Sequence, residues 1–213
     1  MKEFHENDQE RFWSDYNEEF SGDLVSNVVI RMSRKYIGKR ILDVGAGSGA
    51  LAKKVNATAI DLVPKGGNVI KGDCTNLQFE NHAFDTVFCT ELIEHLNDQD
   101  LEKCLKEINR VLKPDCYAVF TTNYDENLKA STVTCPDCGS RFHKWGHCQS
   151  FSEKRIKDLL IKEGFEIVEL KKLNLGFVAV FNFLAKIFYK TRMDKLFKNK
   201  MLQKNLFIVA RKS

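Results

Sequence analysis

The chain has 213 residues, of which 43% are hydrophobic and 29% are charged, so it can bury a substantial core as an ordinary globular protein. Its net charge of +4 is unevenly spread, because the first thirty residues are acidic and the tail is basic, and solvated helix faces explain both ends most simply. No apolar run reaches the roughly 18–20 residues of a membrane-spanning helix, and the charged start shows no secretory signal pattern. We therefore expect a cytoplasmic protein whose cysteines are reduced thiols.

The first predicted structure is one or two helices over residues 10–36, because four aromatic residues recur there at helical spacing. Packing of their side chains into the core is the simplest interpretation. These residues are Phe12, Trp13, Tyr16 and Phe20.

The next segment, residues 40–55, predicts a buried strand, a tight turn and the start of a helix. An apolar run carries Asp43 and then breaks into alternating glycines, Gly45, Gly47 and Gly49. Glycine lets a nucleotide-like ligand lie against bare backbone and permits the positive φ that such turns often need. Asp43 is the more informative residue, because a buried carboxylate without a partner is costly.

Strands and helices alternate along the rest of the chain, which predicts an α/β fold with a doubly wound parallel sheet. A helix over residues 98–111 should end before Pro114, and Ser152 should cap another helix that Gly164 ends. The predicted strands are 40–44, 57–60, 69–70, 84–89, 117–122, 165–170 and 205–210.

Acidic residues follow two of these strands. Asp61 ends the second strand, where a carboxylate can accept both ribose hydroxyls of a ligand. Asp73 follows the third strand, and a turn or cap role is the structural alternative for it. Because ligands of open parallel sheets bind at the carboxyl ends of the strands, we expect both side chains at one site.

The spacing of Asp43 and the three glycines resembles the first motif of the class I S-adenosylmethionine-dependent methyltransferases. Three later segments resemble further motifs of that family, and the resemblance covers residues 38–123 well and the last two predicted strands more loosely. The glycines also fit the looser fingerprint of a nicotinamide-dependent dehydrogenase, but the later segments favour a methyltransferase. These segments are Gly72-Asp73-Cys74, residues 84–96 and Val111-Leu112-Lys113-Pro114.

The resemblance implies a Rossmann-like, seven-stranded, mostly parallel sheet whose last strand runs antiparallel between the fifth and the sixth. It implies S-adenosylmethionine as the cofactor, with Asp61 on the ribose and Asp73 on the adenine amino group. It also implies that the aromatic N-terminal helix closes over the cofactor. The expected cofactor-binding residues are Asp43, Gly45, Ala46, Gly47, Gly49, Asp61, Leu62, Asp73, Cys74, Thr90 and Glu91.

The chemistry of this cofactor asks mainly for an acceptor held in line with the methyl group and for exclusion of water. A hydroxyl or an acidic carbon as acceptor would also need a base. His95, which follows the cofactor-facing turn, is the catalytic candidate. A structural hydrogen bond is the equal alternative for His95, and a carboxylate, thiol or amine acceptor needs no base.

Residues 123–151 are predicted to form a polar loop that carries a Cys-x2-Cys pair, two histidines and a further cysteine. This ligand set suits tetrahedral zinc, and we expect one structural zinc ion. The spacing also resembles a zinc knuckle, a module that often binds single-stranded nucleic acid. There are two alternatives. In one, the cysteine pair is reduced and binds no metal, and the histidines line the acceptor pocket. In the other, the cysteine pair is redox-active. The candidate ligands are Cys135, Cys138 and His143, with His147 and Cys148 competing for the fourth position.

The last distinctive segment, residues 174–203, mixes phenylalanine with lysine. A helix that packs on the protein with its lysine amines in water is the favoured interpretation. Contact with an anionic membrane surface or a lipid-linked acceptor is the first alternative, and a groove for a bulky apolar substrate is the second.

Taken together, we expect one domain over residues 1–213, with a helical cap (1–37), a Cys/His-rich loop insertion (123–151) and a Phe/Lys-rich helical insertion (174–203). The expected function is in-line methyl transfer to a small-molecule, lipid-linked or glycan-linked acceptor. A nucleic-acid methyltransferase is one rival, although Cys89-Thr90-Glu91-Leu92 stands where such enzymes show Asn/Asp-Pro-Pro-Tyr/Phe. A non-catalytic binding protein of the same fold is the other. The residues single out neither the acceptor nor the oligomeric state.

Overall fold

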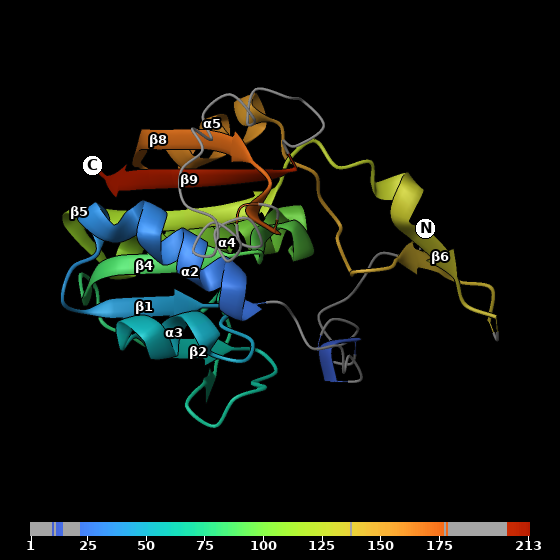
Figure 1. Ribbon diagram of the computed structural model, residues 1–213, viewed down its shortest axis with the longest axis horizontal. Helices are drawn as coiled ribbons and strands as arrows, with labels where there is room; N and C mark the ends of the chain where they lie inside the picture. The colour runs from blue at the N-terminus through green and yellow to red at the C-terminus, as the bar shows by residue number, and fades with distance from the viewer. Residues whose placement is uncertain (1–9, 11, 15–21, 137, 177, 179–203) are drawn as a thin grey trace, which may run out of the picture.

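The computed structural model describes residues 10, 12–14, 22–136, 138–176, 178 and 204–213, and a seven-stranded sheet forms its centre (Figure 1). The strands of this sheet are β1 (Ile41–Val44), β2 (Thr58–Asp61), β3 (Ile70–Lys71), β4 (Phe84–Thr90), β5 (Leu112–Asn123), β8 (Phe165–Leu173) and β9 (Asn205–Lys212). Their order is β3-β2-β1-β4-β5-β9-β8. The first five pair in parallel, whereas β9 is antiparallel to both β5 and β8. The doubly wound fold and the position of the antiparallel strand are therefore confirmed.

Helices cover both faces of the sheet (Figure 1). Helices α2 (Gly22–Ser33) and α3 (Ala50–Val55) lie on one face, and α4 (Asp98–Val111) and α5 (Glu153–Lys162) lie on the other. Because side chains alternate along a strand, Val87 packs with the α4 and α5 cluster and Phe88 with the α2 and α3 cluster. Both side chains are 0% exposed, so β4 is a central strand buried on both faces.

The end of α4 and both ends of α5 lie where the sequence predicted them, and Asn97 caps the start of α4 in addition. The side chain of Asn97 accepts a hydrogen bond from Asp100 N at 2.9 Å at the start of α4, which ends at Val111 as expected. Ser152 Oγ accepts from Arg155 N at 3.2 Å at the start of α5, and Gly164, with φ of 82°, follows its end. Three short 3-10 helices complete the described elements, η1 (Arg34–Tyr36), η2 (Ile93–His95) and η3 (Leu128–Ser131).

The polar loop predicted for residues 123–151 contains more regular structure than expected. Strands β6 (Thr132–Thr134) and β7 (Arg141–His143) pair antiparallel in a separate small sheet, which extends from the right-hand side of the main sheet in Figure 1. The β-branched residues of β6 favour a strand, but its three residues are too few to show a period in the sequence.

Two predictions fall mainly outside the described residues. In the N-terminal helical segment the structure describes Phe12 and Trp13 but not Tyr16 or Phe20, and of residues 174–203 it describes only 174–176 and 178. Among the helices that it describes, none combines the length and the apolar character needed to cross a membrane.

Candidate active site

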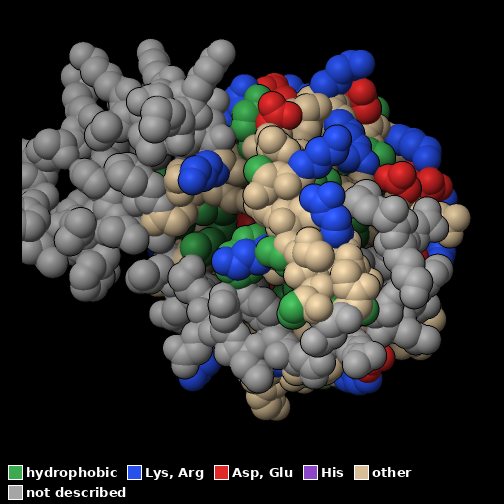
Figure 2. All heavy atoms as spheres, turned by 90° about the vertical axis from the view of Figure 1, so that its right-hand side faces the viewer, with side chains coloured by type: hydrophobic (Ala, Val, Ile, Leu, Met, Phe, Trp, Pro, Cys, Tyr) green, Lys and Arg blue, Asp and Glu red, His purple; other side chains and the backbone are tan. Residues whose placement is uncertain are grey.

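A cavity of about 1000 Å³ opens at the carboxyl ends of β1, β2, β4 and β5. Figure 2 faces this edge of the sheet and shows hydrophobic side chains in a recess with Lys and Arg side chains beside it. The chain order reverses between β1 and β4, and ligands of open α/β sheets bind at such a switch point. The cavity therefore lies where the sequence placed the site.

The glycine turn after β1 forms one wall of the cavity. Gly45 and Gly47 have φ of 73° and 54°, and the backbone N–H groups of Gly45 and Ala46 both donate to Ile60 O at 2.9 Å. A Cβ on Gly45 would come within 2.9 Å of Leu92 Cδ1, whereas a Cβ on Gly47 would meet nothing within 4 Å. The turn therefore needs glycine for its conformation, and at Gly47 it presents bare backbone to the cavity.

Asp61 holds this turn from the end of β2. Its Oδ2 accepts from Gly47 N at 2.7 Å and its Oδ1 accepts from Val63 N at 2.8 Å. Burial raises the pKa of this carboxyl more than the two hydrogen bonds lower it. Because each carboxylate oxygen has a second lone pair, Asp61 can still accept hydroxyl groups of a ligand in the cavity that it lines.

Asp43 is the second acid of this wall and is only 1% exposed. Burial, the largest cause, and repulsion from Asp61 outweigh a backbone hydrogen bond from Ala52 and raise its pKa to about 7. Its Oδ1 has no hydrogen-bond partner among the described residues, although it lies beside the cavity. An uncompensated buried acceptor of this kind suits a ligand that brings a cationic or hydrogen-bonding group.

Most of the other predicted cofactor residues line the cavity, and Gly49 packs beside its wall. Leu62, Asp73, Cys74 and Thr90 line the cavity. Asp73 also accepts from Thr75 N and Thr75 Oγ1, both at 2.8 Å, so the turn role proposed as its alternative is present as well. Gly49 lies outside the lining formed by the described residues, and a Cβ there would meet Val69 Cγ2 at 2.8 Å. Gly49 thus allows α3 to start close to the segment before β3.

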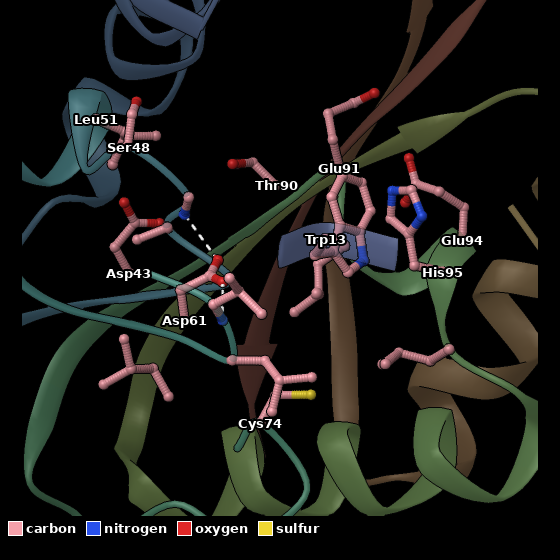
Figure 3. A pocket seen from close by; sticks show the side chains of 18 of the residues that line it. Trp13, Asp43, Ser48, Leu51, Asp61, Cys74, Thr90, Glu91, Glu94 and His95 are labelled. Atoms are coloured by element: carbon pink, nitrogen blue, oxygen red, sulfur yellow. Dashed lines mark hydrogen bonds between the residues drawn. The ribbon is translucent and has the colours of Figure 1, made fainter. Parts of the chain in front are cut away.

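The far half of the cavity is built by aromatic and titratable side chains. Figure 3 shows Asp43 and Asp61 on one side and Trp13, Glu94 and His95 on the other, with Thr90 between them. Glu91 has φ of 50° in the turn after β4. Burial raises the pKa of Glu91, and burial together with the Glu91 charge raises that of Glu94 well above its usual range. A bound ligand therefore meets carboxyl groups with reduced acidity here.

His95, the catalytic candidate, also lines this half. Its ring stacks edge-on against Trp13 at 4.8 Å between centroids and against His147 at 4.7 Å. Burial and the neighbouring His147 lower its pKa to about 3. At neutral pH, His95 is therefore a neutral ring that holds a proton only weakly.

Of the predicted zinc ligands, His143 and His147 lie together, but no cysteine joins them among the described residues. Among the described residues, two groups of three side chains have ligand atoms within 4.8 Å of one another, Glu94-His95-His147 and Glu126-His143-His147, and neither contains a cysteine. Cys135 and Cys138 lie in the turn between β6 and β7, and Cys148 Sγ donates to His95 O at 3.0 Å. The Cys/His ligand set is therefore absent from the described structure, because the histidines turn toward Glu126 instead.

Several lining residues had no place in the sequence-based site. Trp145 and Asn123 carried no motif, and Glu94 belonged to a recognised segment without an assigned role. Glu126 contacts both histidines from outside the lining, at 3.4 Å to His143 Nε2 and 2.7 Å to His147 Nδ1. Only the path of the chain between β5 and α5 brings it there, so no local pattern could have indicated it.

The sequence matches the family described as methyltransferase domain over residues 8–170. An uncharacterised protein of Methanocaldococcus jannaschii is 27% identical over 184 residues, which cover 72% of each chain. The ubiquinone biosynthesis O-methyltransferase of Paracidovorax citrulli is 31% identical over 114 residues, 44% of this chain and 47% of that protein, so the match spans about half of that relative.

A solved structure shows the same fold. The 1,6-didemethyltoxoflavin-N1-methyltransferase of Burkholderia thailandensis, with bound 1,6-didemethyltoxoflavin and S-adenosylhomocysteine, superposes with a TM-score of 0.60 at 17% identity. The match covers 97% of this chain and 83% of that chain. Because the family match spans most of the chain and the sheet has the order that the sequence motifs implied, the chain belongs to the class I S-adenosylmethionine-dependent methyltransferases.

Proposed function

We propose that this methyltransferase acts on a small-molecule acceptor that binds between Trp13, Trp145 and His147. The observation that carries the proposal is the cavity, which continues from the glycine turn past Thr90 to these residues. Its volume of about 1000 Å³ is at the upper end of the roughly 300–1,000 Å³ of ligand pockets, which leaves room for an acceptor beside the cofactor.

The described residues fit the cofactor. Bare backbone at Gly47 would accommodate the nucleoside, and Asp61 would accept its ribose hydroxyls. The unpaired Oδ1 of Asp43 could take the amino group of the methionine part. When bound, S-adenosylmethionine supplies an activated methyl group. The residues around it supply orientation and exclude water.

The acceptor side of the cavity combines flat apolar walls with polar groups. Trp13 and Trp145 offer ring faces, and Asn123, Glu91 and His147 offer hydrogen bonds. A small amphipathic or planar molecule matches this lining, and the Burkholderia thailandensis enzyme holds a small heterocyclic molecule together with S-adenosylhomocysteine. Recognition of a lipid-linked acceptor by residues 174–203 stays a prediction from the sequence.

Calorimetric titration with S-adenosylhomocysteine tests the cofactor part of the proposal. We expect saturable binding at micromolar to millimolar concentration and no binding of NAD, because the motifs and the acids match the sulfonium cofactor. Binding of NAD in place of S-adenosylhomocysteine would contradict it. Competition by single-stranded nucleic acid, lost at high salt, would instead support a nucleic-acid acceptor.

The zinc prediction retains only the cysteine pair as support. Hydrogen bonding with Ser140, and then with Cys135, lowers the pKa of the Cys138 thiol to about 7, which favours a metal-binding thiolate. Two thiols are half of the four ligands of a structural zinc, so we expect elemental analysis to find less than about a tenth of an equivalent per chain. One equivalent of zinc that is lost in Cys135→Ser would contradict this expectation.

A further inference from the structure

We propose that His147 is the general base of this enzyme, that Glu126 is its positioning residue, and that the acceptor is therefore a hydroxyl compound. The inference rests on the proposed function, because it names the chemistry of the acceptor that the same cavity would take. It assigns the base to a different histidine from the one that the sequence suggested.

The contact between the two side chains sets the tautomer of His147. His147 Nδ1 lies 2.7 Å from Glu126 Oε2, and the two side chains are 9% and 18% exposed. Because a carboxylate only accepts hydrogen bonds, this short contact assigns the proton to Nδ1 and the lone pair to Nε2. Asn123 Nδ2 lies 3.4 Å from the same nitrogen but 3.2 Å from Glu126 Oε2, so we assign its hydrogen bond to the carboxylate. His147 lines the cavity and Glu126 is not among the described lining residues, so we infer that Nε2, the nitrogen that does not contact Glu126, is the one available to the acceptor.

One further hydrogen bond and a nearby histidine ring favour the carboxylate form of Glu126. Asn123 Nδ2 donates to its Oε2 at 3.2 Å, and His143 Nε2 lies 3.4 Å from its Oε1. Burial alone would raise the pKa of Glu126, but the hydrogen bond from His147 and the two nearby histidines outweigh it and lower that pKa. The carboxylate can therefore orient His147 and stabilise the charge that the ring gains when it accepts a proton.

The hydrogen bonds of His143 argue against a cation in this group. His143 Nδ1 accepts from Trp145 N at 3.2 Å and from His147 N at 3.1 Å, so its proton lies on Nε2, the nitrogen that faces Glu126. A metal ligand needs a lone pair at the coordinating nitrogen. The two histidine nitrogens beside Glu126 are therefore assigned as protonated; His147 Nδ1 is in hydrogen-bond contact with Glu126, whereas His143 Nε2 lies 3.4 Å away and makes no hydrogen bond among the described residues.

The backbone around His147 is anchored to Glu94 in the far half of the cavity. Glu94 O accepts from Cys148 N at 2.8 Å and from Gln149 N at 3.1 Å. These bonds attach the loop after β7 to η2, which directly follows the turn at the end of β4. His147 therefore faces the cavity from a fixed position, as a base with a defined target requires.

The methyl transfer needs no group other than these residues and the two substrates. The acceptor oxygen forms the new C–O bond to the methyl carbon, the C–S bond breaks, and its electron pair remains on sulfur. The hydroxyl proton moves to His147 Nε2. The positive charge thus passes from the sulfonium to a histidinium that Glu126 stabilises.

NMR of the histidine ring nitrogens tests the arrangement without any acceptor. The chain has five histidines, which single variants can assign. We expect the proton on Nδ1 of His147 and on Nε2 of His143, and a changed proton position on His147 in Glu126→Ala. Glu126→Gln should retain the wild-type signal because its amide oxygen can still accept, and the exposed Glu80→Ala is the control. A proton on Nε2 of wild-type His147 would overturn the proposal.

Release of S-adenosylhomocysteine with panels of phenols, alcohols, amines and thiols tests the chemistry. We expect hydroxyl acceptors to be methylated and His147→Ala to lower kcat about 10²- to 10⁴-fold. Binding of S-adenosylhomocysteine should be unchanged in this variant, and His82→Asn is the surface control.

Two results would overturn the assignment in this assay. One is wild-type kcat in His147→Ala with a hydroxyl acceptor, and the other is wild-type methylation of amines or thiols only. Failure of the wild type to bind S-adenosylhomocysteine would refute the proposed function, whereas the assignment of His147 would still be decided by its ring-nitrogen signals. If no panel member is methylated, the ring-nitrogen measurement decides for or against His147.

Discussion

Replacement of Asp43 by asparagine is expected to weaken the binding of S-adenosylhomocysteine about 100-fold or more. The side chain is 1% exposed, and its Oδ1 has no partner among the described residues. Removal of one member of a buried charge pair costs roughly 3–5 kcal/mol, and about 1.4 kcal/mol corresponds to a factor of ten in Kd. Calorimetric titration of both proteins measures the loss.

The pH dependence of the same titration identifies the ionised group. Because burial raises the pKa of Asp43 to about 7, the free wild-type protein is largely protonated there at pH 6 and must lose that proton to pair with an amino group. Affinity should therefore rise from pH 6 to pH 8 and level off above the pKa. An equal slope in Asp43→Asn would show that another group is responsible, and the exposed Asp158→Asn serves as the matched control.

Replacement of Asp61 by alanine is expected to weaken the same binding by about 1–3 kcal/mol, or roughly 5- to 150-fold. The change removes the acceptor for the ribose hydroxyls and leaves Gly47 N and Val63 N without their partner at 2.7 and 2.8 Å. The loss therefore combines a missing ligand contact with a less ordered glycine turn. Titration of wild type and variant at one pH measures it.

A graded series separates these two contributions. Asp61→Asn keeps one oxygen that can accept a hydrogen bond, so its affinity should lie between those of the wild type and Asp61→Ala. Asp158→Ala, which changes an exposed acid on α5, should bind as the wild type does. Unchanged affinity in Asp61→Ala would remove Asp61 from the cofactor site.

The cofactor half of the site could be predicted because its residues are close together in the sequence. Asp43, Gly45 and Gly47 are alternate positions along one strand and its turn, and Asp61 ends the next strand of the sheet. The carboxyl ends of parallel strands meet at one edge, so strand order and the switch point were enough to bring these residues together. The capped ends of α4 and α5 were predictable for the same local reason.

The Cys/His loop could not be predicted, because spacing fixes which ligands are near in sequence but not where their side chains point. The pattern suggested that Cys135 and His143 share an ion, yet the β6–β7 hairpin leaves the cysteine pair at its turn. His143 and His147 face Glu126, which precedes them by 17 and 21 residues and showed no motif. Burial then lowered the pKa of His95, an effect of neighbours that a sequence does not display.

The sequence by itself therefore determined the α/β fold, the class of enzyme and the wall that would hold the cofactor. Strand and helix periods, glycines that need positive φ and acids at strand ends sufficed for the fold and the wall, and the resemblance of the motifs to a known family gave the class of enzyme. Only the tertiary structure decided how the far half of the cavity is built, from Trp13, Glu94, Trp145 and His147. These residues come from separate segments, and long-range packing and hydrogen bonding, rather than any local pattern, decide which of them meet.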